Sequence, residues 1–238
     1  MINPKSGINE ENAERRTLKT MKFFAGRRKN KMKLIILGGF LGSGKTTVLM
    51  PLADEIVNNI EGGDKNKLCI IENEIGTVSI DSAFADGELY EERELANGCI
   101  CCSLFGPLVD CLEEIEKSMN PEWVVLEATG LARPMNITEQ LWDFYDENMN
   151  ITTIVMIDAT RWMKITKIKP ELVYDQIDSA DYILLNKKDL VGEDELAAIE
   201  ADIADGTDGK IYEISALKDP EGVKKMCKEI VQEILSWE

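Results

Sequence analysis

A glycine-rich run, Gly39–Thr46, limits what this chain can fold into more than any other part of the sequence. It reads GFLGSGKT and fits the pattern G-x-x-x-x-G-K-[ST] at each fixed position. An apolar run, Leu34–Leu37, precedes it, and a segment with helical spacing follows it. Glycines let the backbone curl so that successive N–H groups point inward at phosphate oxygens. The pattern therefore predicts a phosphate-binding loop between a strand and a helix.

The residues of this loop have separate expected roles at a nucleoside triphosphate. Lys45 is expected to neutralise charge on the β- and γ-phosphates, and the Thr46 hydroxyl to hold Mg²⁺. The residues expected to hold the nucleotide here are Gly42, Ser43, Gly44, Lys45, Thr46 and Thr47.

A second apolar run ends in a carboxylate, Glu127, with Gly130 three residues further on. A strand-end acid beside the phosphate loop is where Mg²⁺ or an attacking water needs a negative partner. Glu127 is therefore predicted to bind Mg²⁺ and to contribute to catalysis together with Lys45 and Thr46. The N–H of Gly130 can then reach the γ-phosphate. The alternative is a solvated acid at the end of a strand.

Two later segments indicate which base is bound. The run Asn186–Asp189 (NKKD) follows the predicted strand Tyr182–Leu185. A carboxylate at Asp189 can accept both the N1–H and the 2-amino hydrogens of guanine, an arrangement that adenine lacks. Asn186 is expected to tie neighbouring loops together, and the Lys187 stem to pack over the base. The alternative for this run is a surface turn.

The second of these segments supports guanine more weakly. Ser215, Ala216 and Leu217 follow the predicted strand Lys210–Ile214. They resemble a loop whose backbone N–H reaches the O6 atom of guanine. The expected ligand is GTP or GDP.

Three cysteines gather in the run Gly98–Cys102 (GCICC): Cys99, Cys101 and Cys102. Thiolates at this density select soft or borderline metals such as Zn²⁺ or Cu⁺. The chain has no histidine, so a fourth ligand must be a carboxylate, water or a partner chain. Glu72 and Glu74 could complete the site, since alternate strand residues share a face. An incompletely closed site suits transfer of a metal better than its retention.

Other interpretations of these residues stay open. The cluster could be a redox pair or plain packing, although adjacent Cys101 and Cys102 would form a strained disulfide. The two glutamates could be a polar strand exit. The remaining cysteines, Cys69, Cys111 and Cys227, fall on expected core faces.

The rest of the chain alternates between strand and helix patterns. Strands that are apolar on both faces predict a mostly parallel sheet with helices on both faces, a three-layer α/β fold of the P-loop NTPase type. Residues 1–31 are polar and basic and are expected to form a disordered tail, with the P-loop domain spanning 32–238. Strands are expected at Lys33–Leu37, Leu68–Ile71, Trp123–Leu126, Ile151–Ile157, Tyr182–Leu185 and Lys210–Ile214. Helices are expected at Lys45–Asn59, Pro107–Met119, Ile137–Tyr145, Glu193–Ile203 and Val223–Leu235, with Pro107 at the first position of its helix.

Charge and composition exclude several classes of function. The formal net charge is −17, and such a field repels a phosphate backbone, so nucleic acid is not an expected partner. No stretch approaches the roughly 20 apolar residues of a membrane helix, and the first ten residues lack an apolar core, so no secretory signal is expected. A cytoplasmic protein is expected. Without histidine, a Ser-His catalytic triad is excluded.

Taken in order along the chain, these motifs resemble the CobW-type proteins. These proteins belong to the metal-related P-loop GTPases, a larger group that also includes HypB and UreG. The run Gly98–Cys102 is the most specific part of the resemblance. The other segments that carry it are Gly39–Thr47, Ile71–Asp81, Glu127–Gly130 with Pro134, Ile157–Ala159 and Asn186–Asp189. Two features depart from the family: this sequence has no histidine-rich stretch, so the usual C-terminal domain is not expected in it, and Thr77 stands where Glu is common.

The resemblance implies GTP hydrolysis coupled to delivery of a transition metal, zinc or cobalt, to a client protein. It also implies that two protomers, or a client, meet across the nucleotide face. We expect slow intrinsic turnover, since no arginine finger can be assigned and Arg133 is only the nearest candidate in sequence. We also expect the γ-phosphate to order segment 74–98 and so to change metal affinity at the cysteines. The alternative functions are a nucleotide-gated chaperone for a corrinoid (cobalamin) enzyme, with a structural cysteine site, and a kinase or ATPase.

Overall fold

The computed structural model of the chain describes residues 32–64, 67–72, 91–94, 105–145 and 150–237. Within them, seven strands form one sheet in the order β3-β2-β4-β1-β5-β6-β7, and every neighbouring pair is parallel. The strands are β1 (Lys33–Gly39), β2 (Leu68–Glu72), β3 (Glu91–Glu94), β4 (Trp123–Glu127), β5 (Asn150–Asp158), β6 (Tyr182–Asn186) and β7 (Lys210–Glu213).

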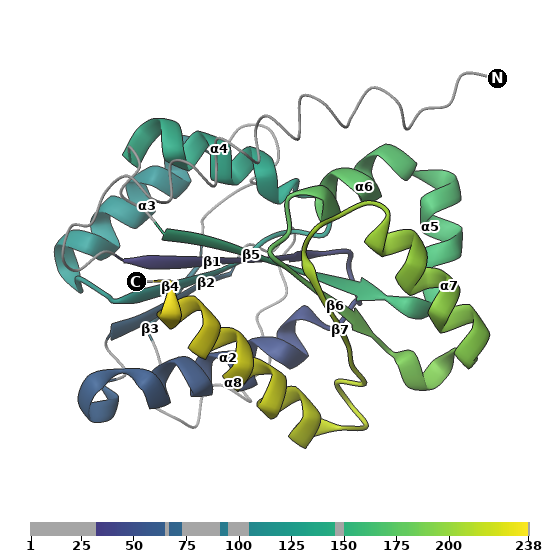
Figure 1. Ribbon diagram of the computed structural model, residues 1–238. Coiled ribbons are helices and arrows are strands. Elements are labelled where there is room, and N and C mark those ends of the chain that lie inside the picture. Colours follow the sequence, from purple (N-terminus) through teal and green to yellow (C-terminus); the bar gives the residue numbers. More distant parts are fainter. Residues whose placement is uncertain (1–31, 65–66, 73–90, 95–104, 146–149, 238) are drawn as a thin grey trace.

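The helices cover both faces of this sheet (Figure 1). They are α2 (Lys45–Asn59), α3 (Phe105–Ser118), α4 (Pro134–Tyr145), α5 (Trp162–Ile168), α6 (Pro170–Asp178), α7 (Glu193–Ala204) and α8 (Pro220–Ser236). Short 3₁₀ turns occur at η1 (Glu61–Gly63), η4 (Ala159–Arg161) and η5 (Lys188–Leu190). The three-layer α/β fold expected from the sequence is confirmed.

The core divides into two layers because side chains alternate along each strand. On one face, Ile35 and Leu37 of β1 pack with the apolar side chains of α2 and α8. On the other face, Leu34 and Ile36 pack with α3 and α4. A third cluster joins β5 and β6 to α6 and α7 around Trp162. The central strands are therefore buried on both sides, which explains their continuous apolar sequences.

Several expected elements start or end elsewhere, and three were missed. Helix α3 begins at Phe105, so the placement of Pro107 at the first helical position is wrong; Pro107 lies two residues later, in the first turn, where its missing N–H still costs no intrahelical bond. Helix α4 begins at Pro134, three residues before the expected start. The helices α5 and α6 and the edge strand β3 were not predicted.

Parallel strands bring their carboxyl ends to one edge of the sheet, and ligands bind outside that edge. The ends of β1, β4, β5 and β6 therefore place the phosphate loop, Glu127, Asp158 and Asn186 near one another. Residues 1–31 lie outside the described residues. None of the helices in the described part of the chain is both long and apolar enough to span a bilayer.

Candidate nucleotide site

The phosphate loop connects β1 to α2, as the sequence predicts. Gly42 and Gly44 have φ angles of 78° and 107°, the left-handed region that glycine adopts at little cost. The Lys45 side chain is buried, and its Nζ donates a hydrogen bond to the Gly39 carbonyl oxygen at 3.0 Å. The lysine side chain thus folds back to the first glycine of the loop.

Gly44 could not be replaced by a larger residue. A Cβ atom at this position would collide with Nδ2 of Asn186. The close approach brings the asparagine side chain against the backbone of the phosphate loop. Glycine is therefore required here both by φ and by the packing of a residue from β6.

Asn186 joins three loops through one buried side chain. Its Nδ2 donates to the Ser43 carbonyl oxygen at 2.8 Å. Its Oδ1 accepts from the backbone N–H of Lys187 at 2.8 Å and of Ala216 at 2.9 Å. From the sequence, Asn186 was expected to tie neighbouring loops together; the structure shows that its side chain bonds to the phosphate loop, the NKKD segment and the loop after β7.

Lys187 adds a second tie to the phosphate loop. Its Nζ donates to the Gly42 carbonyl oxygen at 2.7 Å and to Oδ2 of Asp158 at 2.6 Å. The Lys187 backbone is left-handed, with φ of 65°, which turns the chain from β6 into η5. From the sequence, the stem of Lys187 was expected to pack over the base, and no role was predicted for Asp158.

Asp158 ends β5, and its carboxylate is nearly buried. Oδ1 accepts from the Thr160 N–H at 3.0 Å and from the Thr160 hydroxyl at 2.6 Å. Burial by itself raises the pKa of Asp158, but the hydrogen bonds from Lys187 and Thr160 outweigh it, so that the pKa lies below its usual value. A charged Asp158 thus anchors the lysine that holds the phosphate loop.

The acid that ends β4 lies beside the first turn of α2. Both carboxylate oxygens of Glu127 are 3.5 Å from the Thr46 hydroxyl, and Oε1 is 3.9 Å from Lys45 Nζ. The structure thus brings together the three residues that the sequence named for catalysis. A hydroxyl and a carboxylate are hard oxygen donors, which suit Mg²⁺.

Gly130 lies against the tip of the phosphate loop. A Cβ atom added to Gly130 would lie 2.7 Å from the backbone nitrogen of Leu41. Gln176 of α6 is buried and stabilises the loop that contains Gly130. Its Nε2 donates to the carbonyl oxygens of Gly130 at 3.2 Å and of Ala132 at 2.9 Å. Sequence reasoning missed Gln176, because a lone glutamine in an unpredicted helix carries no motif.

Two buried hydroxyls line this region without a hydrogen-bond partner among the described residues. They are Ser43 Oγ in the phosphate loop and Thr129 Oγ1 in the loop after β4. Buried polar atoms are normally satisfied, so each such exception calls for a missing partner. Together with the left-handed glycines and the oxygen donors at Glu127, these hydroxyls fit a bound triphosphate and Mg²⁺.

The residues expected to read guanine flank the same edge. Asp189 is exposed in η5, directly after Lys187 and Lys188. Ser215 and Ala216 are buried, and the Ala216 N–H is already taken by Asn186, whereas Leu217 is 82% exposed. Of the residues expected to read the base, Asp189 and Leu217 therefore lie at the surface, whereas Ser215 and Ala216 lie in the interior.

The predicted transition-metal ligands lie largely outside the described residues. Cys99, Cys101, Cys102 and Glu74 are not among them, and of Glu72 only the backbone is described, paired with Glu127 at the ends of β2 and β4. Over the ranges that are described, no three Cys, Asp or Glu side chains gather in a way that would hold a metal ion. The expected burial of the other cysteines is found for Cys69 and Cys227, and Cys111 is half-buried.

This fold, with a phosphate loop tied to the end of β6 by Asn186 and Lys187, defines a P-loop nucleotide-binding domain. The chain belongs to the CobW/HypB/UreG nucleotide-binding domain family, whose model matches residues 33–211. The resemblance noted from the sequence is confirmed.

Individual relatives agree with this assignment. The chain is 30% identical over 203 residues to the zinc-regulated GTPase metalloprotein activator 1 of Schizosaccharomyces pombe, covering 77% of this chain and 48% of the relative. It is 33% identical over 174 residues to the zinc chaperone YjiA of Escherichia coli, covering 70% of this chain and 52% of the relative. The chain thus spans about half the length of these curated relatives.

A solved structure of a zinc-bound triple variant of the YjiA GTPase superposes with a TM-score of 0.57 at 25% identity. The match covers 78% of this chain and 58% of that one. It supports the same three-layer fold.

Proposed function

We propose that this chain binds and hydrolyses GTP and couples the nucleotide state to delivery of a transition metal, with zinc the first candidate. The relatives that it matches are named as zinc-regulated GTPases and zinc chaperones, which supports zinc over cobalt. The proposed recipient is a client protein in the cytoplasm. A second copy of the chain meeting it across the nucleotide face is the other proposed partner.

The observation that carries the GTP part is the position of Asn186. By bonding to Ser43 and Ala216 at once, it fixes the distance between the loop that would hold phosphates and the loops that would hold the base. In this arrangement we propose that Asp189 accepts hydrogen bonds from guanine and that the Leu217 N–H donates to guanine O6. Adenine would present neither matching group to these two positions.

Hydrolysis would depend on positioning and charge rather than on a proton-shuttling histidine. A water attacks the γ-phosphorus in line, the bond to the β–γ bridging oxygen breaks, and GDP and phosphate leave. Bound Mg²⁺ would neutralise charge on the phosphate oxygens. Lys45 would turn from Gly39 toward the phosphates, Thr46 and Glu127 would hold the ion, and the loop N–H groups would orient the triphosphate.

The metal part rests on the sequence of the cysteine cluster and on the names of the relatives. Cys99, Cys101 and Cys102, with Glu72 and Glu74, are proposed as ligands of the delivered metal. Ordering of segment 74–98 by the γ-phosphate would change their geometry, and couplings of this kind are typically about 1–3 kcal/mol.

The GTP part is tested by measuring hydrolysis of GTP and of ATP by the full chain with Mg²⁺. We expect turnover of GTP, weak competition by ATP, and loss of turnover in Lys45→Ala. Preference for ATP would contradict the assignment and favour the kinase or ATPase alternative.

The metal part is tested by Zn²⁺ and Co²⁺ titration against a chromophoric chelator under reducing conditions. Titrations are compared with a non-hydrolysable GTP analogue and with GDP. We expect tight binding that depends on the nucleotide and is lost in Cys99→Ser, Cys101→Ser and Cys102→Ser. Cys111→Ser, a cysteine on α3 outside the cluster, is the matched control. Equal affinities with both nucleotides would contradict the coupling, and unfolding of the serine variants would favour a structural cysteine site.

A further inference from the structure

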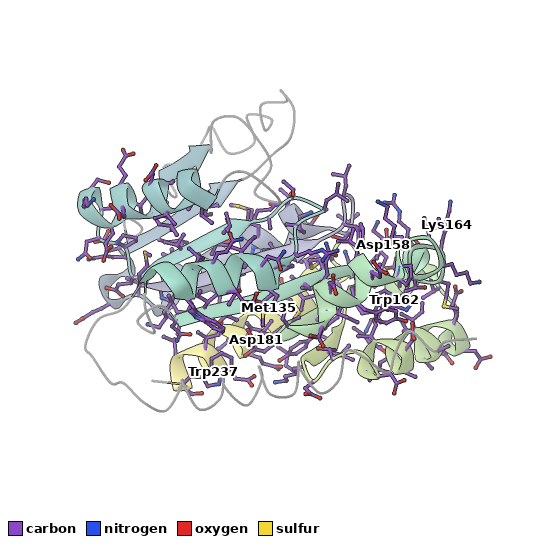
Figure 2. All side chains as sticks on the ribbon, turned by 90° about the horizontal axis from the view of Figure 1, so that it is seen from above. Met135, Asp158, Trp162, Lys164, Asp181 and Trp237 are labelled. Carbon is purple, nitrogen blue, oxygen red and sulfur yellow. The ribbon has the colours of Figure 1, made fainter. Side chains whose placement is uncertain are left out.

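Arg161 lies against the tip of the phosphate loop. It ends η4, the turn that follows β5, and its Nη1 donates to the Leu41 carbonyl oxygen at 3.0 Å. A Cβ atom added to Gly42 would lie 3.5 Å from the same Nη1. Figure 2 shows Asp158, Trp162 and Lys164, which flank this residue in sequence, gathered at one side of the molecule.

The position of Arg161 follows from the turn that precedes it. The Asp158 carboxylate accepts the Thr160 N–H and hydroxyl, which curls the chain back immediately after β5. Trp162 is then buried and its indole N–H donates to Asp202 of α7 at 2.8 Å. The backbone of Arg161 is thus held between an anchored turn and an anchored tryptophan, which places the start of its side chain beside the loop.

The charge of Arg161 is only partly neutralised where it lies, because it shares the Asp158 carboxylate with Lys187. Its Nε is 3.4 Å from Asp158 Oδ2, but the same oxygen accepts from Lys187 at 2.6 Å, so the lysine is the main partner. The Arg161 side chain is 53% exposed, whereas that of its partner Asp158 is 3% exposed, so the guanidinium end of the pair faces solvent. A guanidinium has five N–H donors, and among the described residues only Leu41 and Asp158 accept from this one.

We propose that Arg161 is a catalytic arginine supplied by the chain itself, a cation that contacts the triphosphate and stabilises the transition state of hydrolysis. The inference rests on the proposed GTP hydrolysis. When the γ-phosphorus separates from the β–γ bridging oxygen, negative charge grows on that oxygen and is spread over the γ-phosphoryl oxygens. Arg161 donates hydrogen bonds to this charge, and it neither gives nor takes a proton because it stays charged throughout.

Arg133, the arginine nearest to a motif in sequence, is directed elsewhere. Its Nη1 is 2.8 Å from Asp175 Oδ2, so it joins the loop before α4 to α6. Arg161 could not be identified from the sequence, because Leu41, which it contacts, lies 120 positions away along the chain.

The test compares Arg161→Ala with Lys164→Ala. Lys164 is exposed on α5, and its replacement removes the same charge within one turn without touching the phosphate loop. Single-turnover GTP hydrolysis, the Kd for GDP, and formation of the GDP–aluminium fluoride complex are measured on the full chain. Arginines of this kind contribute on the order of 10³-fold or more. We expect a fall in rate of that order in Arg161→Ala, loss of the aluminium fluoride complex, and a GDP affinity within about threefold of the original chain.

Other outcomes separate this inference from the proposed function. If Arg161→Ala hydrolyses GTP at the rate of Lys164→Ala, or if its GDP affinity falls as far as its rate, Arg161 is not catalytic. If Arg161→Ala does not fold, Arg161→Lys is used, which keeps the positive charge but loses the planar guanidinium with its several N–H donors. An unchanged rate of GTP hydrolysis in Arg161→Lys would also overturn the assignment. A parent chain that binds GDP but does not hydrolyse GTP contradicts the proposed function itself, and this inference with it.

Discussion

The side-chain nitrogen of Asn186 lies 2.8 Å from the carbonyl oxygen of Ser43, although 143 positions separate the two residues. This bond joins the end of β6 to the phosphate loop after β1, two strands that are not neighbours in the sheet. The strand between them, β5, contributes Asp158, which holds Lys187 against the same loop. The nucleotide site is therefore braced from the β5–β6 half of the sheet.

Asn186→Ala is expected to lower both stability and nucleotide affinity. The change leaves Ser43 O and two backbone N–H groups without their side-chain partner, and a buried unsatisfied group costs about 1–3 kcal/mol. We expect the free energy of unfolding in urea to fall by about 3 kcal/mol, and GDP binding to weaken at least tenfold. Asn59→Ala, at the exposed end of α2, is the control and should change neither by much. Wild-type affinity in Asn186→Ala would contradict the bracing role.

Asp189→Asn is expected to change which base is bound. The carboxylate accepts two hydrogens from guanine, whereas an amide can donate to the 2-oxo group of xanthine. Hydrogen bonds to charged groups are worth about 1.5–3 kcal/mol, so GTP affinity should fall by roughly 10²-fold while xanthosine triphosphate affinity rises. Competition against a fluorescent GDP analogue measures both. Equal loss of both nucleotides would show that Asp189 acts only on the fold of η5.

Gly130→Ala is expected to impair hydrolysis more than GDP binding. Its new Cβ would lie 2.7 Å from Leu41 N, so the backbone of one loop must shift, which typically costs about 1–3 kcal/mol. We expect the hydrolysis rate to fall by more than tenfold. Gly192→Ala is the matched control, because an added Cβ there meets nothing within 4 Å. If both variants hydrolyse GTP equally fast, the close approach of Gly130 has no functional consequence.

Asp158→Asn is expected to destabilise the fold in a manner that depends on pH. Burial alone would raise the pKa of Asp158, but hydrogen bonds from Lys187 and Thr160 lower it overall. The carboxylate therefore stabilises the folded state above its unfolded pKa of about 4, and this contribution is lost as the pH falls through the lower folded pKa. The difference in unfolding free energy between the original chain and Asp158→Asn should be largest near neutral pH and should shrink below about pH 4.

A second variant tests whether Lys187 causes the lowered pKa of Asp158. In the Lys187→Met background, the main hydrogen bond that lowers the pKa of Asp158 is absent. The pH-dependent part of the Asp158→Asn effect should then diminish. The same pH dependence with and without Lys187 would show that the carboxylate is stabilised by other groups.

Motifs and long apolar runs predicted most of the fold, and short or polar elements were missed. The helix Lys45–Asn59 was predicted with its observed bounds, because an apolar stripe follows a fixed glycine motif. By contrast β3 reads EERE, and nothing in four charged residues indicates a strand; it forms because the edge of β2 offers backbone partners. Helices α5 and α6 are short and meet at Pro170, so neither repeats an apolar period for long enough.

The residues of the candidate site likewise fall into two groups, those that a sequence motif predicts and those that only the folded chain brings together. Residues within motifs, such as Lys45 and Asn186, could be assigned from the sequence because their neighbours fix their surroundings. Gln176 and Arg161 could not, since their roles depend on contacts with Gly130 and Leu41 that only the folded chain creates. The cysteine cluster remains a prediction from its spacing alone.

The bonds from Asn186 and Lys187 to the phosphate loop also affect when the protein can work during its synthesis. A ribosome makes the phosphate loop early, but the Gly42 and Ser43 carbonyls receive their partners only after 143 or more further residues have been added. The loop after β7, which Asn186 also holds, emerges later still. A nascent chain therefore cannot complete these ties to the phosphate loop until nearly all of the sheet has left the exit tunnel.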